Sequence, residues 1–593
     1  MLGLPKIHFI ILLLIVLGNQ VESDASNHRY SNGDIVPFYV NKVGPYSNPS
    51  ETYAFYDLPF CSPDTLAEKK LNLGEMLNGD RLISAPYKLK FLDEKDFEVL
   101  CNKTLSKKDV SQFRSVIEKD YFIQLYYDDL PIWGFIGTTE RDYTDAKIRN
   151  QYFLFKHFEF EVYYNKDRVI EVRLLMHHNY LANVTEDKEV VVDFRYSVKW
   201  LVTQQSFDKR MDKDIGSTFI PDHIIHRASI ANSFVTLLIL IICVLTFYVL
   251  VLRKDISKYS NDVEENQVAD NQEETGWKNI HGDVFRFPKH KSLFAAALGS
   301  GSQLLVLIVS MLVLGLLGFF PPYLRGAFWN ALVIVYAVTN VVAGYTSVSF
   351  YSQLEGTTWM NNLLATGGLY FGPLFLAFCF LNSVAISYGT TVALPLAATV
   401  VLSLILVFIA SPLLLLGGFV GKHMTPDFQA PCRTTKCPKE VPRQRWYRGL
   451  VPQMVLAGFL PFSVIYVQLY YIFATVWGYR IYTLYSILLV VFVLLLIITA
   501  LMSIVLTYFQ LAAEDHEWWW RSFFCGGSTG LFIYGYCIFY YFFRSDMNGF
   551  MQISYFFGYM ACVSYGIFLV LGTVGFRASL LFVRYLYAAI KCD

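Results

Sequence analysis

The sequence predicts an α-helical polytopic membrane protein with nine transmembrane helices, preceded by a β-rich, sandwich-like luminal domain. Three observations lead to this fold class. Hydrophobic residues make up 54% of the 593 positions and charged residues 17%, whereas ordinary globular chains carry about 25% charged residues. Polar residues dominate up to about Arg227, and long apolar runs follow. Before Arg227, alternating apolar positions and turn residues are typical of strands.

The first residues are predicted to be a secretory signal. Lys6 precedes the apolar stretch from Ile7 to Leu17, which is shorter than the ~20 residues that a spanning helix needs. A basic residue before a short apolar core indicates a signal peptide, here residues 1–23. A retained anchor is the alternative. Residues 24–227 are therefore expected in the secretory lumen.

Within this luminal domain, several segments have clear local patterns. Residues 158–164 and 169–176 alternate in polarity around the turn Asn165-Lys166-Asp167 and predict a hairpin. Residues 190–200 predict another strand, and residues 107–118 a helix. Several strands in about 200 residues favour a sandwich-like domain.

Two further features fit a secretory compartment. Asn102 and Asn183 each begin an Asn-x-Thr glycosylation sequon. Cys61 and Cys101 are the only cysteines of the domain, and an oxidising lumen would let them pair. Their spacing alone does not establish the bond.

Nine segments are long and apolar enough to span a membrane. They are 233–252, 295–320, 327–350, 363–386, 391–418, 450–476, 482–508, 524–543 and 553–576. The predicted division of the chain after the luminal domain is a first transmembrane helix (228–252), a cytosolic loop (253–292), an eight-helix bundle (293–576) and a cytosolic tail (577–593).

Charge in the loops indicates the orientation. The loops after the first and fifth spans each hold seven Lys or Arg residues, whereas the luminal loops hold only Arg325, Arg480 and Arg544. Because cytosolic loops carry an excess of basic residues, the amino end is predicted to be luminal and the carboxyl end cytosolic. Trp518, Trp519 and Trp520 are expected in the headgroup layer, with the acidic residues Glu514, Asp515 and Glu517 in water.

Motifs for chemistry are mostly missing from the sequence. It has no phosphate-binding glycine loop in a strand-to-helix context and no HExxH, so no enzyme, cofactor or metal site is expected. The 49 basic and 49 acidic residues cancel, which argues against a nucleic-acid partner.

A transporter or channel for an unidentified solute is the alternative function. It rests on uncharged polar residues within the spans: Gln303, Asn330, Asn340, Asn382 and Gln468. Such residues could line a path, or simply hydrogen-bond between helices.

Four strings together resemble one family. They are YSNGDIVPFYVNKVGPYSNPSETYAFYDLPFC (30–61), GWKNIHGDVFRFP (276–288), LPFSVIYVQLYYIFATVWG (460–478) and TYFQLAAEDHEWWWRS (507–522). In this order on a nine-span chain, they resemble the nonaspanins, also called the transmembrane 9 superfamily or endomembrane protein 70 family. ATVWG and YTLYSIL look closest to the member 1 branch, and FVRYLYAAIKCD resembles plant members. An acidic residue often stands in the family where this chain has Gln468.

The resemblance implies a Golgi and endosome membrane protein that sorts other membrane proteins, without enzymatic activity. It implies coatomer binding by the tail residues Lys591, Cys592 and Asp593. It also implies an export signal from the endoplasmic reticulum, read by a coat, in Phe582, Val583, Arg584, Tyr585, Leu586 and Tyr587. The expected clients are membrane proteins with glycine-rich spans, and close helix packing at Gly299, Gly301, Gly367 and Gly368 would receive them within the lipid bilayer.

Overall fold

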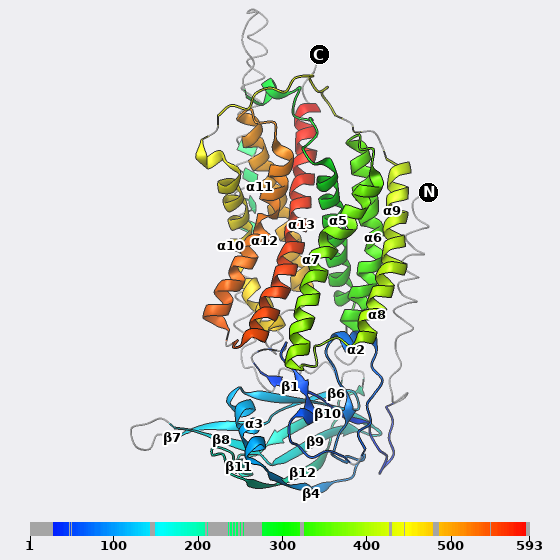
Figure 1. Ribbon diagram of the computed structural model, residues 1–593, viewed down its shortest axis with the longest axis vertical. Coiled ribbons are helices and arrows are strands. Elements are labelled where there is room, and N and C mark those ends of the chain that lie inside the picture. The colour runs from blue at the N-terminus through cyan, green and yellow to red at the C-terminus, as the bar shows by residue number, and fades with distance from the viewer. Residues whose placement is uncertain are drawn as a thin grey trace, which may run out of the picture.

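The computed structural model describes residues 28–588 apart from short gaps and the longer gaps 143–148, 211–234, most of 235–275, 321–324 and 478–484. The predicted signal peptide, most of the first predicted transmembrane helix, most of the loop up to residue 275 and the tail residues 589–593 therefore lie outside the described residues. The described chain is elongated, with a β domain at one end and a helix bundle above it (Figure 1). We call the end of the bundle remote from the β domain the distal end.

Three sheets form the β domain. The first sheet has the strand order β2 (Tyr53–Ala54), β1 (Phe38–Pro45), β5 (Tyr121–Tyr127) and β6 (Leu130–Phe135), with β3 (Ile83–Ser84) also paired to β1. The second has the order β10 (Arg168–Met176), β9 (His157–Asn165), β12 (Val190–Val202) and β4 (Lys95–Leu105). The third has the order β11 (Leu181–Asn183), β8 (Arg149–Phe155) and β7 (Gly137–Asp142). The first two sheets share one apolar core, in which Phe38 of β1 meets Phe160 of β9 with ring centroids 5.7 Å apart. The predicted β-rich domain is thus confirmed.

Locally encoded elements of this domain agree with the sequence. The predicted helix is α3 (Lys107–Glu118), which begins at Ser106, where the side chains of Ser106 and Asp109 form a capping box. Its apolar side chains, including the fully buried Phe113, face the core. The predicted hairpin is β9–β10, and the predicted strand at 190–200 is β12. β12 pairs in parallel with β9, which local pattern does not reveal.

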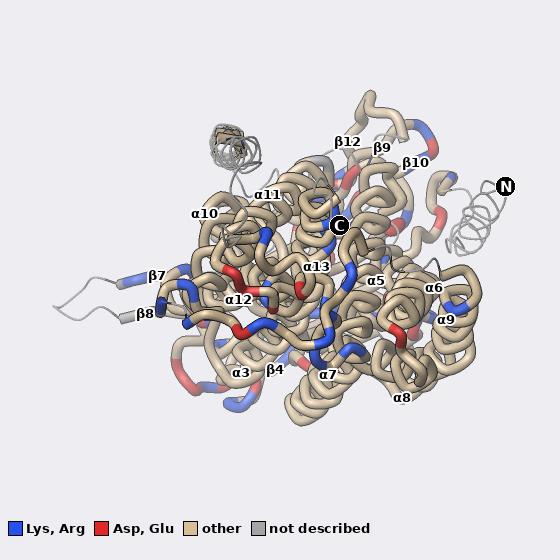
Figure 2. The backbone as a smooth tube through the Cα atoms, turned by 90° about the horizontal axis from the view of Figure 1, so that it is seen from above, with Lys and Arg blue, Asp and Glu red and all other residues tan. Residues whose placement is uncertain are grey.

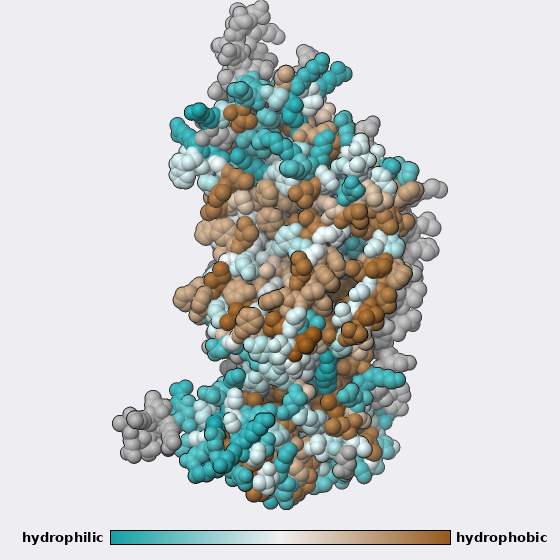
Figure 3. Space-filling view, in the orientation of Figure 1, coloured by the Kyte–Doolittle hydropathy of each residue, from teal (hydrophilic) through white to brown (hydrophobic). Residues whose placement is uncertain are grey.

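The bundle contains eight described helices, or helical runs, long and apolar enough to cross a membrane. They are α5 (Lys291–Leu316), α6 (Ala327–Gln353), α7 (Trp359–Tyr388), α8 (Leu396–Ile405) continued by α9 (Ser411–His423), α10 (Leu450–Val476), α11 (Tyr485–Ala512), α12 (Trp518–Arg544) and α13 (Phe550–Ala588). At 26 residues or more, each is about 39 Å long or longer at ~1.5 Å per residue, which exceeds the ~30 Å of a hydrocarbon core. On the face seen in Figure 3, a hydrophobic band crosses the middle of the molecule between two hydrophilic ends.

Polar side chains inside these helices mostly bind nearby backbone. Gln303 and Asn340 both donate to the Tyr336 carbonyl, at 3.3 Å and 2.8 Å, and Asn382 accepts from the Leu394 amide at 2.8 Å. Buried polar groups satisfied in this way stabilise helix packing. These contacts account for three of the residues on which the transporter alternative rests.

The predicted boundary between bundle and tail differs from the structure. α13 does not end at residue 576 but continues to Ala588. Beyond Phe576, the side chains of Leu580, Val583 and Tyr587 remain buried. Their spacing of three or four residues keeps one helix face against the bundle, so the helix goes on past Arg577.

The β domain is held against the bundle by polar contacts. Arg325, which precedes α6, lies 3.2 Å from a carboxylate oxygen of Glu75 and 3.2 Å from one of Asp129, and its side chain is 6% exposed. The Thr391 amide donates to the Thr52 carbonyl at 2.8 Å. Gln552, at the start of α13, donates to the Glu51 carboxylate. These contacts fix the orientation of the domain relative to the helices.

Candidate functional site at the distal end and lateral face of the bundle

Two of the strings that point to the family meet at the distal end. Residues 276–289, which include the 3₁₀ helix η4 (Gly276–Ile280), fold over the turn between α11 and α12. The Gly276 amide donates to Glu514 at 2.9 Å, the Trp518 indole donates to the Val284 carbonyl at 2.9 Å, and the Trp520 indole donates to the Lys289 carbonyl at 2.8 Å. We call residues 276–289 together with the turn at 513–517 the distal cap.

The tryptophans therefore differ from the prediction. Trp518 and Trp519 are 0% and 2% exposed, so they are core residues and not headgroup anchors. Trp518 stacks on Phe576 of α13 with ring centroids 5.8 Å apart. The physical reason is that residues 276–289 cover these rings and offer a carbonyl to one indole N–H, which a membrane interface would otherwise provide.

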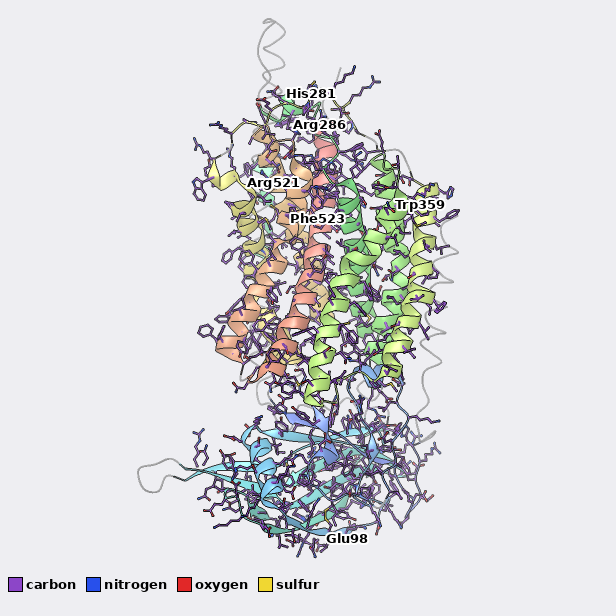
Figure 4. All side chains as sticks on the ribbon, in the orientation of Figure 1. Glu98, His281, Arg286, Trp359, Arg521 and Phe523 are labelled. Carbon is purple, nitrogen blue, oxygen red and sulfur yellow. A yellow bond between two sulfur atoms is a disulfide. The ribbon has the colours of Figure 1, made fainter. Side chains whose placement is uncertain are left out.

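The acidic residues beside them also have structural partners. Asp515 is 3% exposed and pairs with Arg521 at 3.1 Å, so its predicted place in water is wrong. The hydrogen bond from the Gly276 amide lowers the pKa of Glu514 below its ordinary value. Figure 4 labels Arg521 and Phe523 on α12, with His281 and Arg286 above them in the distal cap.

A second loop is tied to the cap through Asp283. This carboxylate accepts from Arg286, from the Lys439 amide at 3.0 Å and from the Thr435 hydroxyl at 2.9 Å. Burial acts to raise the pKa of Asp283, but these hydrogen bonds outweigh it and lower the pKa below its ordinary value. The loop between α9 and α10 is therefore part of one ordered distal surface.

The residues of the predicted export signal lie in the last turns of α13. Phe582, Val583, Leu586 and Tyr587 are buried, and the Tyr587 hydroxyl donates to the Trp277 carbonyl at 2.5 Å. Tyr585 is 75% exposed. Lys591, Cys592 and Asp593 lie outside the described residues. Among the six residues of the predicted signal, Tyr585 is the one whose side chain is largely exposed and open to contact by a partner.

The four glycines expected to receive a client span divide into two pairs. A Cβ at Gly299 would lie 2.6 Å from Ser347, and one at Gly301 would lie 2.4 Å from the Leu569 carbonyl. These two glycines let α5 pack against α6 and α13, so their prediction as client contacts is wrong. On α7, a Cβ at Gly367 would lie a tight 3.0 Å from one side-chain carbon of Leu414, whereas one at Gly368 would meet nothing within 4 Å.

The outer face of α7 carries a further glycine one turn along. Gly372, four residues after Gly368, also faces open space, so the two form a Gly-x-x-x-Gly stripe on the membrane-facing side. Leu364 and Leu376, one turn before and after this stripe, are 70% and 71% exposed. Such stripes allow the backbones of two membrane helices to approach closely.

An apolar pocket of about 420 Å³ opens beside this face. Its lining comes from four helices: His290, Leu293 and Ala297 at α5, Leu369 of α7, Trp520, Phe523 and Phe524 of α12, and Tyr565, Phe568 and Leu569 of α13. Leu369 directly follows Gly368 in the chain. The pocket was not predicted, because its residues are spread over some 280 positions of sequence and look individually like ordinary span residues.

The predicted sites of the β domain lie at its surface or hold it together. Asn102 of β4 and Asn183 of β11 are exposed. Cys61 and Cys101 form a disulfide that links the segment after η1 (Phe55–Asp57) to β4. Among the described residues, no group of three or more His, Cys, Asp or Glu is arranged to hold a metal ion.

Comparison with known proteins assigns the family. A model of the endomembrane protein 70 family matches residues 52–550. The chain belongs to this family. Transmembrane 9 superfamily member 3 of Arabidopsis thaliana is 60% identical over 99% of this chain and 98% of the relative, and member 2 of the same plant is 61% identical over 97% and 96%. Putative phagocytic receptor 1b of Dictyostelium discoideum is 42% identical over 99% and 100%. No solved structure matches the chain.

The family assignment confirms the predicted transmembrane 9 membership and the multi-pass architecture. The bovine member 1 protein is 41% identical over 98% of this chain and 97% of the relative, below the two Arabidopsis relatives. These four relatives carry the names of membrane proteins or of a receptor, not of an enzyme.

Proposed function

We propose that this protein sorts other membrane proteins and recognises their spans on the outer face of α7. The observation that carries the proposal is the open Gly368–Gly372 stripe beside the apolar pocket. A client helix with its own glycines would pack closely on the stripe, and a large side chain of the client would enter the pocket. Close packing is the main source of helix association in lipid, where apolar burial alone gives little gain.

The proposed setting is the Golgi and endosome membranes, with the β domain in the lumen and the distal end in the cytosol. Excess Lys and Arg in the loops of the distal side support this orientation. Figure 2, seen from the distal end, has Lys and Arg positions beside the end of α13. Exposed Asn102 and Asn183 are the proposed glycan sites. Lys591, Cys592 and Asp593 are the proposed coatomer signal, and the name of the Dictyostelium relative fits a membrane role of this kind.

The client site is tested by Gly368→Leu and Gly372→Leu, singly and together. The expected result is that the double variant loses most co-isolation with a reporter membrane protein whose span is glycine-rich, while its own location stays the same. Gly535→Leu is the matched control, because this exposed helical glycine also faces open space but lies on α12, outside the stripe. Unchanged co-isolation and sorting of the reporter by the correctly localised double variant would contradict the proposal.

The tail signal is tested by Lys591→Ala combined with Asp593→Ala in the full chain. Escape of this variant from the Golgi to later compartments is expected if coatomer retains the protein through the tail. Tyr585→Ala tests the export signal, because Tyr585 is exposed and its replacement leaves the packing of α13 intact. Normal exit of the Tyr585→Ala protein from the endoplasmic reticulum would remove Tyr585 from that signal.

A further inference from the structure

Two arginines in the last turns of α13 have no counter-charge among the described residues. Arg577 and Arg584 are seven residues apart, so both lie on nearly the same side of the helix, about 10 Å from each other along it. Both side chains are partly buried. Within the described part of the chain, neither guanidinium forms a salt bridge, and the buried Nε of Arg584 has no hydrogen-bond acceptor.

Aromatic rings take the place that carboxylates would occupy. The Arg577 guanidinium lies over the Phe350 ring at 5.2 Å from its centroid, and the Arg584 guanidinium lies over Phe428 at 4.8 Å. A ring face attracts a cation but does not neutralise it. The two like charges therefore remain uncompensated in a partly desolvated position, which is unfavourable without an anion.

Trp519 adds a third donor to the same cluster. The Trp519 ring contacts both rings over which the arginines lie, with its centroid 6.3 Å from that of Phe350 and 6.1 Å from that of Phe428. Trp519 is 2% exposed, and its indole N–H has no hydrogen-bond partner among the described residues. Trp518 and Trp520, by contrast, both donate to backbone carbonyls. Two guanidinium groups and one indole N–H thus belong to one aromatic cluster, and the described chain supplies no carboxylate to them.

Three other buried or partly buried arginines of the described chain have carboxylate partners. Arg325 pairs with Glu75 and Asp129, Arg210 pairs with Asp128 at 2.8 Å, and Arg521 pairs with Asp515. Pairing is not universal, since the partly buried Arg168 lies over the Phe207 ring at 4.3 Å without a salt bridge among the described residues. Arg577 and Arg584 differ from it in being two such cations on one helix, one of them with a buried Nε that has no acceptor in the described chain.

We propose that Arg577, Arg584 and Trp519 form a binding site for a phosphate group at the distal end of the bundle. Guanidinium groups match phosphate oxygens with paired, charge-assisted hydrogen bonds. Both arginines lie in the last twelve residues of α13, whose Tyr587 contacts the distal cap. A phospholipid headgroup and a soluble phosphate offer the same chemistry, and the test distinguishes them.

The test uses the purified full chain in detergent and follows its melting temperature with short-chain phosphatidic acid, short-chain phosphatidylcholine or inorganic phosphate. Phosphatidic acid is expected to raise the melting temperature of the wild type by several degrees. Arg577→Gln/Arg584→Gln should weaken this response about tenfold or more in apparent affinity. Arg443→Gln/Arg445→Gln removes the same charge from exposed positions at the same end and should respond like the wild type.

The outcomes separate the ligand sources and the alternatives. Stabilisation by phosphatidic acid but not by inorganic phosphate identifies a lipid headgroup, and stabilisation by both identifies a free phosphate group. An equal response to phosphatidylcholine, or an equal response of both double variants, overturns the proposal.

The melting temperature of Arg577→Gln/Arg584→Gln without ligand distinguishes a binding role of the arginines from a structural one. Without ligand, removing two uncompensated cations should leave the melting temperature equal to or above that of the wild type. A purely structural role for the arginines predicts the opposite, a lower melting temperature in the absence of any ligand. Arg577→Lys/Arg584→Lys keeps the charge but loses paired hydrogen bonding, so it should retain the fold and bind more weakly than wild type. Wild-type affinity in this lysine variant would contradict recognition by guanidinium geometry.

Discussion

Buried and partly buried arginines have different partners at the two ends of the bundle. At the β-domain end, Arg325 has two carboxylate partners and is almost fully buried. At the distal end, Arg577 and Arg584 lie over aromatic rings without a carboxylate among the described residues. At the β-domain end, carboxylates of the chain itself neutralise the arginine, and the ion pairs join the domain to the bundle. At the distal end, no described carboxylate neutralises the arginines, and we infer that an anionic ligand does so.

Among the substitutions that test this difference, Arg325→Met should have the largest effect on stability. Glu75 would be left buried without its cation and Asp129 would keep only Lys69 at 4.0 Å, so the variant should lose about 3–5 kcal/mol of stability at this interface. Limited proteolysis of the β domain and the melting temperature would measure the loss. Lys188→Met removes a cation from the exposed pair with Glu186 and should change stability by less than about 0.5 kcal/mol. Equal effects of the two substitutions would show that Arg325 does not join domain and bundle.

A smaller effect is expected from Trp518→Phe in the distal cap. The substitution keeps most of the ring packing but leaves the Val284 carbonyl without its donor. Because an unsatisfied buried group costs about 1–3 kcal/mol, residues 276–289 should separate more often from the bundle. Faster hydrogen exchange in this segment would measure the opening. Trp520→Phe, at a more exposed position, should have a weaker effect on the same amides.

Acid should loosen the cap slightly through Glu514. Since the pKa of Glu514 is lowered in the folded protein from 4.5, its contribution is complete above about pH 5 and is lost as the pH falls through the lower folded value. The effect should be under about 1 kcal/mol for this partly exposed group.

Tryptophan fluorescence between about pH 6 and pH 3 would follow the change. Glu514→Gln should remove its part of the transition. Asp283, whose pKa is also lowered, should contribute the remaining part in the same direction. A transition unaltered in Glu514→Gln would remove Glu514 from the pH response.

Sequence pattern predicted the elements whose signals are local. The Ser106–Asp109 cap and the spacing of Val110 and Phe113 determine α3 within a dozen residues. The hydrophobic length of the spans likewise predicted the described membrane helices, because the bilayer imposes one simple requirement. Family motifs located the chemically distinctive strings but did not indicate that two of them pack together.

The distal cap and the role of each glycine could not be predicted in this way. Trp518 and Val284 are separated by 234 positions, and an indole suits a membrane interface as well as a core. Gly299 and Gly368 have the same side chain, yet one lies within the bundle and the other faces outward. Composition does not tell which face of a helix is already covered. The end of the last span was predicted at residue 576, too early, because the ring over which Arg577 lies belongs to another helix.

The length of α13 has one more consequence. This helix runs for 39 residues without a proline, or about 58 Å at ~1.5 Å per residue. In its first turn Gln552 donates a hydrogen bond to Glu51 of the β domain, and in its last turn Tyr587 donates one to the Trp277 carbonyl of the distal cap. The β domain and the distal cap, at opposite ends of the bundle, are therefore attached to one continuous helix with no loop in between.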